Sequence, residues 1–206
     1  MTDHAHPHEH APDQPDTPAT HWQLMEAALR ELLIEKGLFT AAEVMREVER
    51  MEGRSPHNGA RIVARAWTDP AFRDWLLSDA GAAIRSLGIE PGPITLMVMA
   101  DTPSLHNVIV CTLCSCYPRV LLGLPPAWYK SFAYRARVVR EPRAVLAEFG
   151  THLGEDIELV VHDSTAELRY IVLPQRPPGT DGWSEEQLAG LVGRDVLVGT
   201  ALPVTA

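Results

Sequence analysis

Cysteine is scarce in this sequence, and its few copies lie together. Only three of the 206 residues are cysteine, and all fall within 111–116. Three are too few for an iron–sulfur cluster held by four cysteines, and a structural zinc would need a fourth ligand such as His106. A Cys114–Cys116 disulfide would be strained, and a Cys111–Cys114 disulfide would leave an odd thiol. Spacing alone leaves two interpretations open: a structural metal or redox cysteine pair, and a catalytic metal held by all three cysteines.

The sequence also lacks long apolar runs and an excess of positive charge. No apolar run approaches the roughly 20 residues of a membrane helix, and no basic stretch followed by an apolar one begins the chain. Lys and Arg number 18 against 27 Asp and Glu, a net charge of −9, which argues against nucleic acid as a partner. We therefore expect a cytoplasmic protein with no nucleic-acid or membrane partner, in a reducing compartment that leaves thiols free for a metal.

The stretch from Cys114 to Cys116 can wrap a metal ion with backbone as well as side chains. The Cys114 sulfur, the Ser115 and Cys116 amide nitrogens and the Cys116 sulfur would form a planar set of two nitrogens and two sulfurs. Cys111 would add an axial sulfur and leave the opposite face open for water or substrate, as a catalytic metal requires. Neither Ser115 nor Cys116 is proline, so both amides are available. Because an amide loses its proton only to a strong Lewis acid, low-spin Co(III) or Fe(III) fits this claw (Cys111, Cys114, Ser115 and Cys116) better than a divalent ion.

Residues 110–118 read VCTLCSCYP and closely resemble the metal-binding motif of the nitrile hydratase alpha subunit, which the gamma subunit of thiocyanate hydrolase shares. The resemblance implies that Cys111 stays an unmodified axial thiolate, Cys114 becomes a sulfinate and Cys116 a sulfenate. Thr112 is typical of the cobalt enzymes, where the iron enzymes usually have serine, so the resemblance implies Co(III) rather than iron. It covers roughly residues 22–203 and includes four further stretches, 58–67, 123–130, 167–170 and 179–183.

The resemblance implies an enzyme, the metal-bearing alpha subunit of a cobalt nitrile hydratase, which hydrates a nitrile to the amide. Cys114 and Cys116 are then the catalytic residues, with the Cys116 sulfenate oxygen acting as nucleophile or base. The resemblance also implies a beta-type partner subunit, whose arginines hold the oxidised cysteines, and an activator that inserts cobalt. An interpretation of a different class is a zinc- or copper-binding carrier whose thiols stay unoxidised.

Arg119 departs from the nitrile hydratase pattern. Those enzymes generally have tryptophan just after Cys-Tyr-Pro, and thiocyanate hydrolase gamma subunits resemble this chain at Arg119 and in its His-rich start. The alternative function is therefore that of the gamma subunit of thiocyanate hydrolase, or a related multi-subunit hydratase, acting on a small anion or polar nitrile. We expect Arg119 at the mouth of the open metal position, where a guanidinium favours such substrates; contact with a partner carboxylate is the alternative.

Composition predicts three regions. Residues 1–20 contain four prolines and four histidines at alternate positions and are expected to be disordered, as a solvated tail or a weak metal tether. Residues 21–90 are predicted to be a helical arm for a partner subunit, because its amphipathic helices have few strands to pack on. The resemblance implies that this arm clasps the beta-type subunit; a self-contained helical subdomain is the alternative. Residues 91–206 are predicted to be an α+β metal-binding catalytic domain, because strands are grouped after the helices.

Caps and apolar periodicity predict the individual elements. Helices are expected at 22–36, 41–51, 60–67, 72–77, 82–87, 125–134 and onward, 141–149 and 184–192. Short apolar runs predict buried strands at 94–100, 105–110, 157–162 and 168–173. The second strand leads directly into Cys111, so the claw is expected on a loop at a strand end.

The remaining polar residues give weaker signals. His106, His152 and His162 are expected to be structural histidines. Arg169 needs a carboxylate or carbonyl partner, because an unpaired charge in a buried strand is costly. Four arginines of an otherwise acidic chain are expected to form helix-surface salt bridges, with subunit contact or support of the anionic claw as the alternative; they are Arg135, Arg137, Arg140 and Arg143.

Overall fold

The computed structural model describes the backbone of residues 20–205 and their side chains except those of 49–52. The chain divides into two compact units, Met1–Val48 and Glu49–Ala206. The tail predicted to be disordered, 1–20, lies outside the described residues except for Thr20. Within 20–205 no helix is long and apolar enough to cross a membrane.

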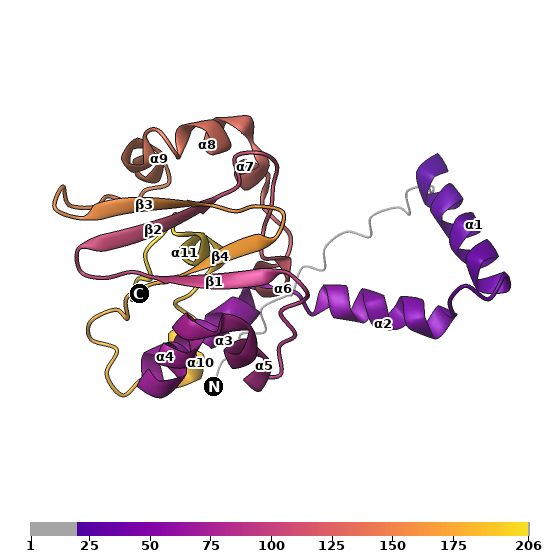
Figure 1. The fold of residues 1–206 in the computed structure, drawn as a ribbon, viewed down its shortest axis with the longest axis horizontal. Coiled ribbons are helices and arrows are strands. Elements are labelled where there is room, and N and C mark those ends of the chain that lie inside the picture. Colours follow the sequence, from indigo (N-terminus) through magenta and orange to yellow (C-terminus); the bar gives the residue numbers. More distant parts are fainter. Residues whose placement is uncertain (1–19, 206) are drawn as a thin grey trace, which may run out of the picture. The chain divides into compact units, whose positions relative to one another are not determined.

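Two helices begin the described chain (Figure 1). Helix α1 (His21–Glu35) starts with a capping box, in which the Thr20 hydroxyl accepts from the Gln23 amide and the Gln23 side chain accepts from the Thr20 amide. It buries none of its side chains. Helix α2 (Ala41–Glu52) follows. Both helices lie where the sequence predicted them, within one residue at each end.

Three helices follow in the larger unit: α3 (Pro56–Thr68), α4 (Pro70–Ser78) and α5 (Ala80–Ser86). Helix α3 begins at Pro56, earlier than the expected residue 60, because proline suits the first turn, where its missing N–H is not needed. Asp69 caps α4 by accepting a hydrogen bond from the Phe72 amide.

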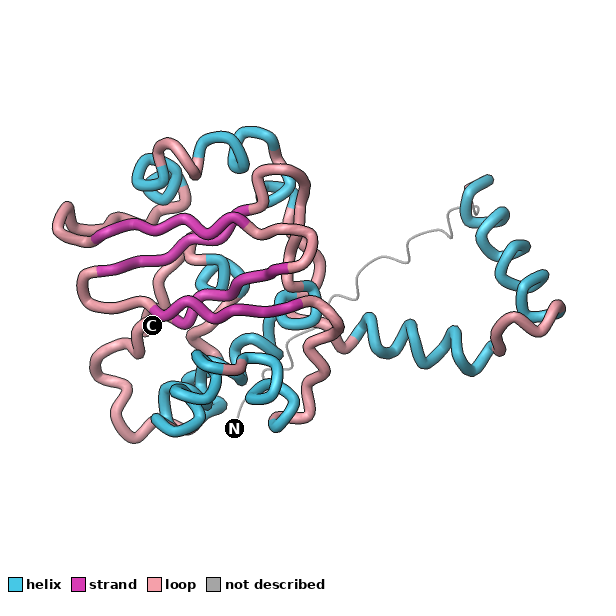
Figure 2. The backbone as a smooth tube through the Cα atoms, viewed as in Figure 1, coloured by secondary structure: helices cyan, strands magenta, loops and turns pink. Residues whose placement is uncertain are grey.

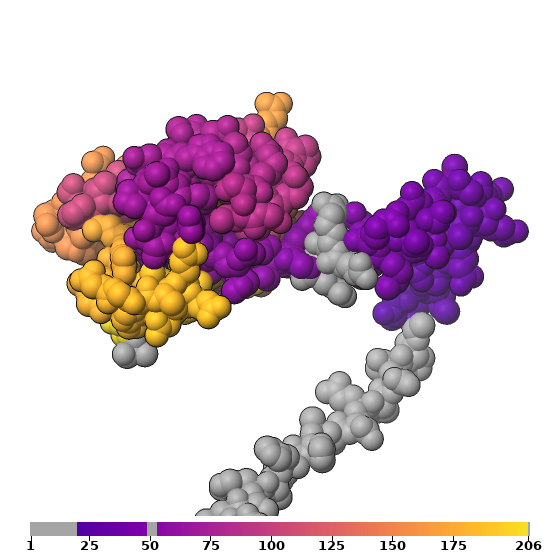
Figure 3. All heavy atoms as spheres, turned by 90° about the horizontal axis from the view of Figure 1, so that it is seen from below, coloured from indigo at the N-terminus to yellow at the C-terminus, as the bar shows by residue number. Residues whose placement is uncertain are grey.

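These three helices pack into the core of the larger unit rather than forming an arm. Ile62, Ala64, Leu76 and Ile84 are fully buried, and α3 contacts α10 (Glu185–Ala189) from the far end of the chain. Figure 3 shows this packing from one side, with the purple surface of the early helices beside the yellow surface of the late residues. We expected the arm to extend to residue 90, whereas the structure divides the chain between 48 and 49. Helices α3, α4 and α5 differ from α1 because other parts of the same chain cover their apolar faces.

Four strands form two parallel pairs in the larger unit. Strand β1 (Thr95–Ala100) pairs with β4 (Leu168–Leu173), and β2 (Leu105–Val110) pairs with β3 (Glu158–Asp163). Figure 2 shows the strands, in magenta, lying between two groups of helices. The four predicted strands are present, and the predicted α+β class is confirmed.

The rest of the larger unit consists of short helices between and after the strands: α6 (Arg119–Leu122), α7 (Ala127–Lys130), α8 (Phe132–Arg137), α9 (Pro142–Glu148), α10 and α11 (Arg194–Val198). Helices α7 and α8 replace the single helix predicted from 125, because Ser131 is extended and caps α8 by accepting from the Tyr134 amide. Helices α6 and α11 were not predicted, since so few residues show no helical periodicity.

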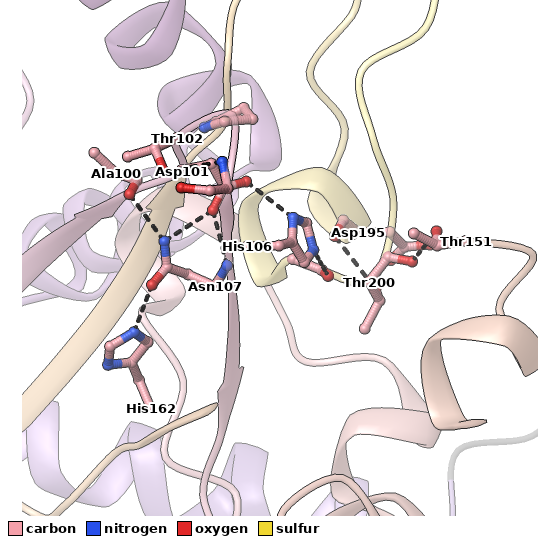
Figure 4. Close-up of polar contacts among 12 residues, drawn as sticks. Ala100, Asp101, Thr102, His106, Asn107, Thr151, His162, Asp195 and Thr200 are labelled. Carbon is pink, nitrogen blue, oxygen red and sulfur yellow. Dashed lines mark hydrogen bonds and ion pairs between the residues drawn. The ribbon is translucent and has the colours of Figure 1, made fainter. Parts of the chain in front are cut away.

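A buried polar network joins the strands to the C-terminal segment (Figure 4). Asp101 Oδ2 lies 3.1 Å from His106 Nδ1, and His106 Nε2 lies 2.8 Å from the Gly199 carbonyl oxygen. The Asn107 amide donates to Asp101 Oδ1, and the Asn107 side-chain oxygen lies 2.8 Å from His162 Nε2. Gly199 has φ of 86° and stands against the Asn107 backbone, where a side chain would clash. The prediction that His106 and His162 are structural is confirmed.

Candidate metal centre

The three cysteine sulfurs lie together in the loop that follows β2. The Cys114 sulfur is 3.4 Å from that of Cys111 and 3.1 Å from that of Cys116, and all three lie within 4.8 Å of one another. Cys111, directly after the strand, is buried, whereas Cys114 is exposed and Cys116 is half-buried. The structure thus brings the three predicted sulfur ligands side by side at one end of β2.

The two backbone amides predicted as ligands stand at the same place. The amides of Cys116 and Ser115 both interact with the Cys114 sulfur, and neither donates to a carbonyl of the described residues. Three sulfurs and two amide nitrogens free of carbonyl partners form a donor set that suits a thiophilic, strongly Lewis-acidic ion. The residues of the claw therefore fit a trivalent metal.

The pKa values of the Cys114 and Cys116 thiols are shifted in opposite directions. Hydrogen bonds from Cys116 and Cys111, with smaller effects of the loop amides, lower the pKa of Cys114 to about 7. Burial, together with the bond to Cys114, raises the pKa of Cys116 to about 12. Of these two thiols, that of Cys114 therefore gives up its proton more readily to an entering ion.

Thr112, directly after Cys111, is held between an anion and a cation. Its amide donates to Asp163 Oδ1 at 2.9 Å and its hydroxyl to Asp163 Oδ2 at 2.5 Å. Arg135 Nη1 donates to the Thr112 carbonyl oxygen at 3.2 Å. Asp163 reaches the loop because it ends β3 directly opposite Val110 of the parallel strand β2. The sequence analysis did not identify Asp163 as a site residue. The signal that could have indicated it is its position at the end of a predicted strand, because the carboxyl ends of paired parallel strands lie at the same edge of a sheet.

Three buried tyrosines support the loop. The Tyr129 hydroxyl donates to the Cys116 carbonyl oxygen at 2.9 Å, and the Tyr134 hydroxyl donates to the Ile109 carbonyl oxygen at 2.7 Å. The Tyr117 and Tyr129 rings meet edge to face with centroids 4.8 Å apart. The backbone on both sides of the claw is therefore fixed by buried donors.

A cavity of about 460 Å³ opens beside the claw. Its lining includes Cys114, Ser115 and Cys116 of the claw. It also includes apolar side chains of the β1 and α6 regions: Ile94, Leu96, Val120 and Leu121. Three arginines also line the cavity, Arg54, Arg119 and Arg169, and its lining contains no carboxylate among the described residues. The cavity lining therefore combines thiols, apolar side chains and three positive charges.

The three cavity arginines come from different parts of the chain. Arg119, the first residue of α6, is exposed, so the structure places it on the cavity that the sequence suggested. Arg54, just before α3, was not predicted, because no motif marks it. Arg169 of β4 donates to the Thr165 and Leu168 carbonyl oxygens, which confirms the prediction of a carbonyl partner. The positive charge of Arg169 lowers the pKa of Cys116 and so partly offsets the increase caused by burial.

The predicted arginine cluster separates into different roles. Arg137 forms the expected surface salt bridges, to Glu141 and Glu148. Arg140 and Arg143 instead donate to backbone carbonyl oxygens. Of the four, Arg135 is the one that contacts the claw loop.

Comparison with known proteins shows the family. The family model for the nitrile hydratase alpha chain matches residues 20–201. The high-molecular-weight cobalt-containing nitrile hydratase subunit alpha of Rhodococcus rhodochrous is 49% identical over 190 residues, 90% of this chain and 93% of that one. Thiocyanate hydrolase subunit gamma of Thiobacillus thioparus is 46% identical over 194 residues, 88% of this chain and 80% of that one. A solved double mutant of the Fe-type nitrile hydratase from Comamonas testosteroni has a TM-score of 0.77 and 45% identity, covering 90% of this chain and 95% of that one. With its claw loop at the end of β2, this chain belongs to the nitrile hydratase alpha-chain family.

Proposed function

We propose that this chain is the metal-bearing alpha subunit of a cobalt nitrile hydratase, which adds water to a nitrile to give the amide. The observation that carries the proposal is that three cysteine sulfurs and two amides free of carbonyl partners lie together in one loop, and that Cys114, Ser115 and Cys116 of this loop line a cavity of about 460 Å³. A structural metal is closed off by four protein ligands, whereas this loop faces a space that admits a small molecule.

The ligands are the sulfurs of Cys111, Cys114 and Cys116 and the amide nitrogens of Ser115 and Cys116. A bound Co(III) ion supplies Lewis acidity toward a nitrile or a water molecule. Thr112 favours cobalt, and the relatives include both a cobalt-containing and an Fe-type enzyme.

Cys114 and Cys116 are the catalytic residues, oxidised to the sulfinate and the sulfenate. The Cys116 sulfenate oxygen acts as nucleophile toward the nitrile carbon or as base toward the attacking water. The contacts of Thr112 with Asp163 and of Cys116 with Tyr129 preorganise the loop, so little chain entropy is lost when the site is assembled. Both reactive sulfurs therefore stay at the cavity.

The enzyme is active only with a beta-type partner subunit, which docks on the exposed apolar side chains of α1. Trp22, Met25, Leu29 and Leu32 recur along that helix at helical spacing and are all exposed. The partner supplies the donors that hold the cysteine oxygens, and an activator inserts the cobalt. The protein works in the cytoplasm, with neither nucleic acid nor membrane as a partner.

A second candidate function is hydrolysis of thiocyanate, as a gamma-type subunit. The positive charges of Arg54, Arg119 and Arg169 favour it, because these cations line a cavity whose described lining lacks carboxylates. Apolar side chains beside them favour a neutral nitrile. Substrate choice thus depends on which part of the cavity the substrate contacts.

The test is to produce the chain with a beta-type partner in cobalt-supplemented medium. We expect about one cobalt per chain, three added oxygens on the claw peptide by intact mass, and hydration of a small nitrile to its amide. Faster turnover of thiocyanate than of any nitrile would favour the second function. Stoichiometric zinc with unoxidised thiols would contradict both functions and support a metal carrier.

A further inference from the structure

The guanidinium of Arg135, on α8, is buried without a counter-ion. Only 8% of Arg135 is exposed. Its Nη1 donates to the Thr112 carbonyl, its Cζ lies 4.6 Å from the centre of the Phe132 ring, and its buried Nε has no partner. Among the described residues Arg135 forms no ion pair; Asp163, which also contacts Thr112, bonds the Thr112 amide and hydroxyl instead. Burial of an uncompensated charge is costly, so a cation at this position implies an anionic neighbour in the working protein.

The other arginines of the cluster do not share this situation. Arg137 is neutralised by Glu141 and Glu148 at the surface. Arg143 satisfies its guanidinium with the carbonyl oxygens of Leu153, Gly154 and Ile157 and makes no contact with the claw. Arg135 therefore differs from Arg137 and Arg143 in two ways: its guanidinium is incompletely hydrogen-bonded, and it contacts the claw loop.

We propose that Arg135 is the counter-charge that this chain itself supplies to the metal-loaded claw. The inference rests on the proposed function. Three sulfur anions and two deprotonated amides carry five negative charges, so a trivalent ion leaves the loaded claw with a net charge of −2. Arg135 is bonded to the carbonyl oxygen of Thr112, the residue after Cys111, so its positive charge lies one residue from a claw ligand. Because Arg135 is buried, the attraction between the two charges is stronger than it would be in water. Because such coupling is reciprocal, the loaded claw stabilises buried Arg135 and Arg135 stabilises the loaded claw.

The experiment compares Arg135→Met, Arg135→Lys and Arg143→Met with wild type, each produced with the partner subunit with and without cobalt. Methionine keeps most of the apolar stem without the charge, lysine keeps the charge, and Arg143→Met is the matched loss of a carbonyl-bonded guanidinium away from the claw. The measurements are the thermal midpoint of each form and the rate at which a chelator removes cobalt.

We expect Arg135→Met to lower the midpoint of the cobalt-loaded form while leaving that of the cobalt-free form unchanged or raised. Cobalt loss should be about ten-fold faster, the effect of losing one charge-assisted contact. Arg135→Lys should retain cobalt nearly as well as wild type, and Arg143→Met should lower both midpoints equally. Equal lowering of both forms by Arg135→Met, or cobalt loss at the wild-type rate, would overturn the inference and leave the proposed function standing. If wild-type protein produced in cobalt-supplemented medium binds no cobalt, both this inference and the proposed function would be overturned.

Discussion

Two backbone amides, those of Ser115 and Cys116, distinguish the proposed claw from an ordinary trio of thiols. The Ser115 nitrogen is proposed as a ligand while the Ser115 side chain is not, so the residue can be changed without touching a sulfur. Ser115→Pro should abolish cobalt binding because proline has no amide proton to lose. Ser115→Ala should bind cobalt as wild type does. Metal analysis per chain, with circular dichroism to confirm folding, checks the pair; equal cobalt in both variants would mean that this amide is not a ligand.

A second prediction at the residue scale is that Arg119 influences substrate preference. Its side chain is exposed and lines the cavity, where a guanidinium favours an anion or a polar nitrile. Arg119→Trp should raise kcat/KM for apolar nitriles and lower it for thiocyanate by roughly ten-fold or more, if a charged contact of about 1.5 to 3 kcal/mol is lost. Arg119→Lys, which keeps the charge, should change both values less. Equal changes for both substrates would indicate a structural role.

At the scale of the elements, the Asp101–His106 pair ties β2 to its neighbours. Burial opposes charge on His106, but the hydrogen bond to Asp101, the charge of Asp101 and the Gly199 carbonyl outweigh it, so the pKa of His106 lies above its ordinary value of 6.5. The stability from this pair is fully present below pH 6.5 and is lost as pH rises through the raised pKa of the folded state.

His106→Gln should therefore reduce the free energy of unfolding more at about pH 6 than at about pH 9. Burial lowers the pKa of His162, but that contribution is common to both proteins and cancels in the difference. Urea unfolding of wild type and variant at each pH measures the effect. A loss of stability that does not change with pH would show that the pair contributes no charge interaction.

At the scale of the whole molecule, the two units differ in how their apolar side chains are covered. The larger unit buries Ile62, Leu76 and Ile84 within its own chain, whereas α1 buries no side chain and leaves Trp22 and Leu29 exposed. Such a helix favours association. The isolated chain should therefore aggregate, and a beta-type partner should rescue it.

Leu29→Glu should weaken assembly with the partner, because a charge would replace an apolar contact. Glu26→Gln, a change on the same helix at a side chain that pairs with Arg30, should leave assembly intact. Light scattering of the co-produced subunits measures the difference. A stable, cobalt-loaded and active monomer would contradict the proposed dependence on a partner.

The sequence by itself determined the features whose chemistry is local. All claw donors lie within 111–116, so their spacing predicted that the sulfurs of Cys111, Cys114 and Cys116 would lie together. The four strands and the caps of α2 and α10, Thr40 and Ser184, were equally predictable, because an apolar run or a capping residue acts on its neighbours in the chain.

Only the tertiary structure decided which distant residues meet the claw. Asp163 contacts Thr112 because β2 and β3 pair in parallel register, and Arg135 and Arg54 arrive from other elements. It also decided that 56–86 join the core instead of extending the arm. The physical reason is that long crossovers connect parallel strands, so their register and the packing of helices are set by which apolar faces cover one another across the fold. No local sequence pattern determines which of these faces pack together.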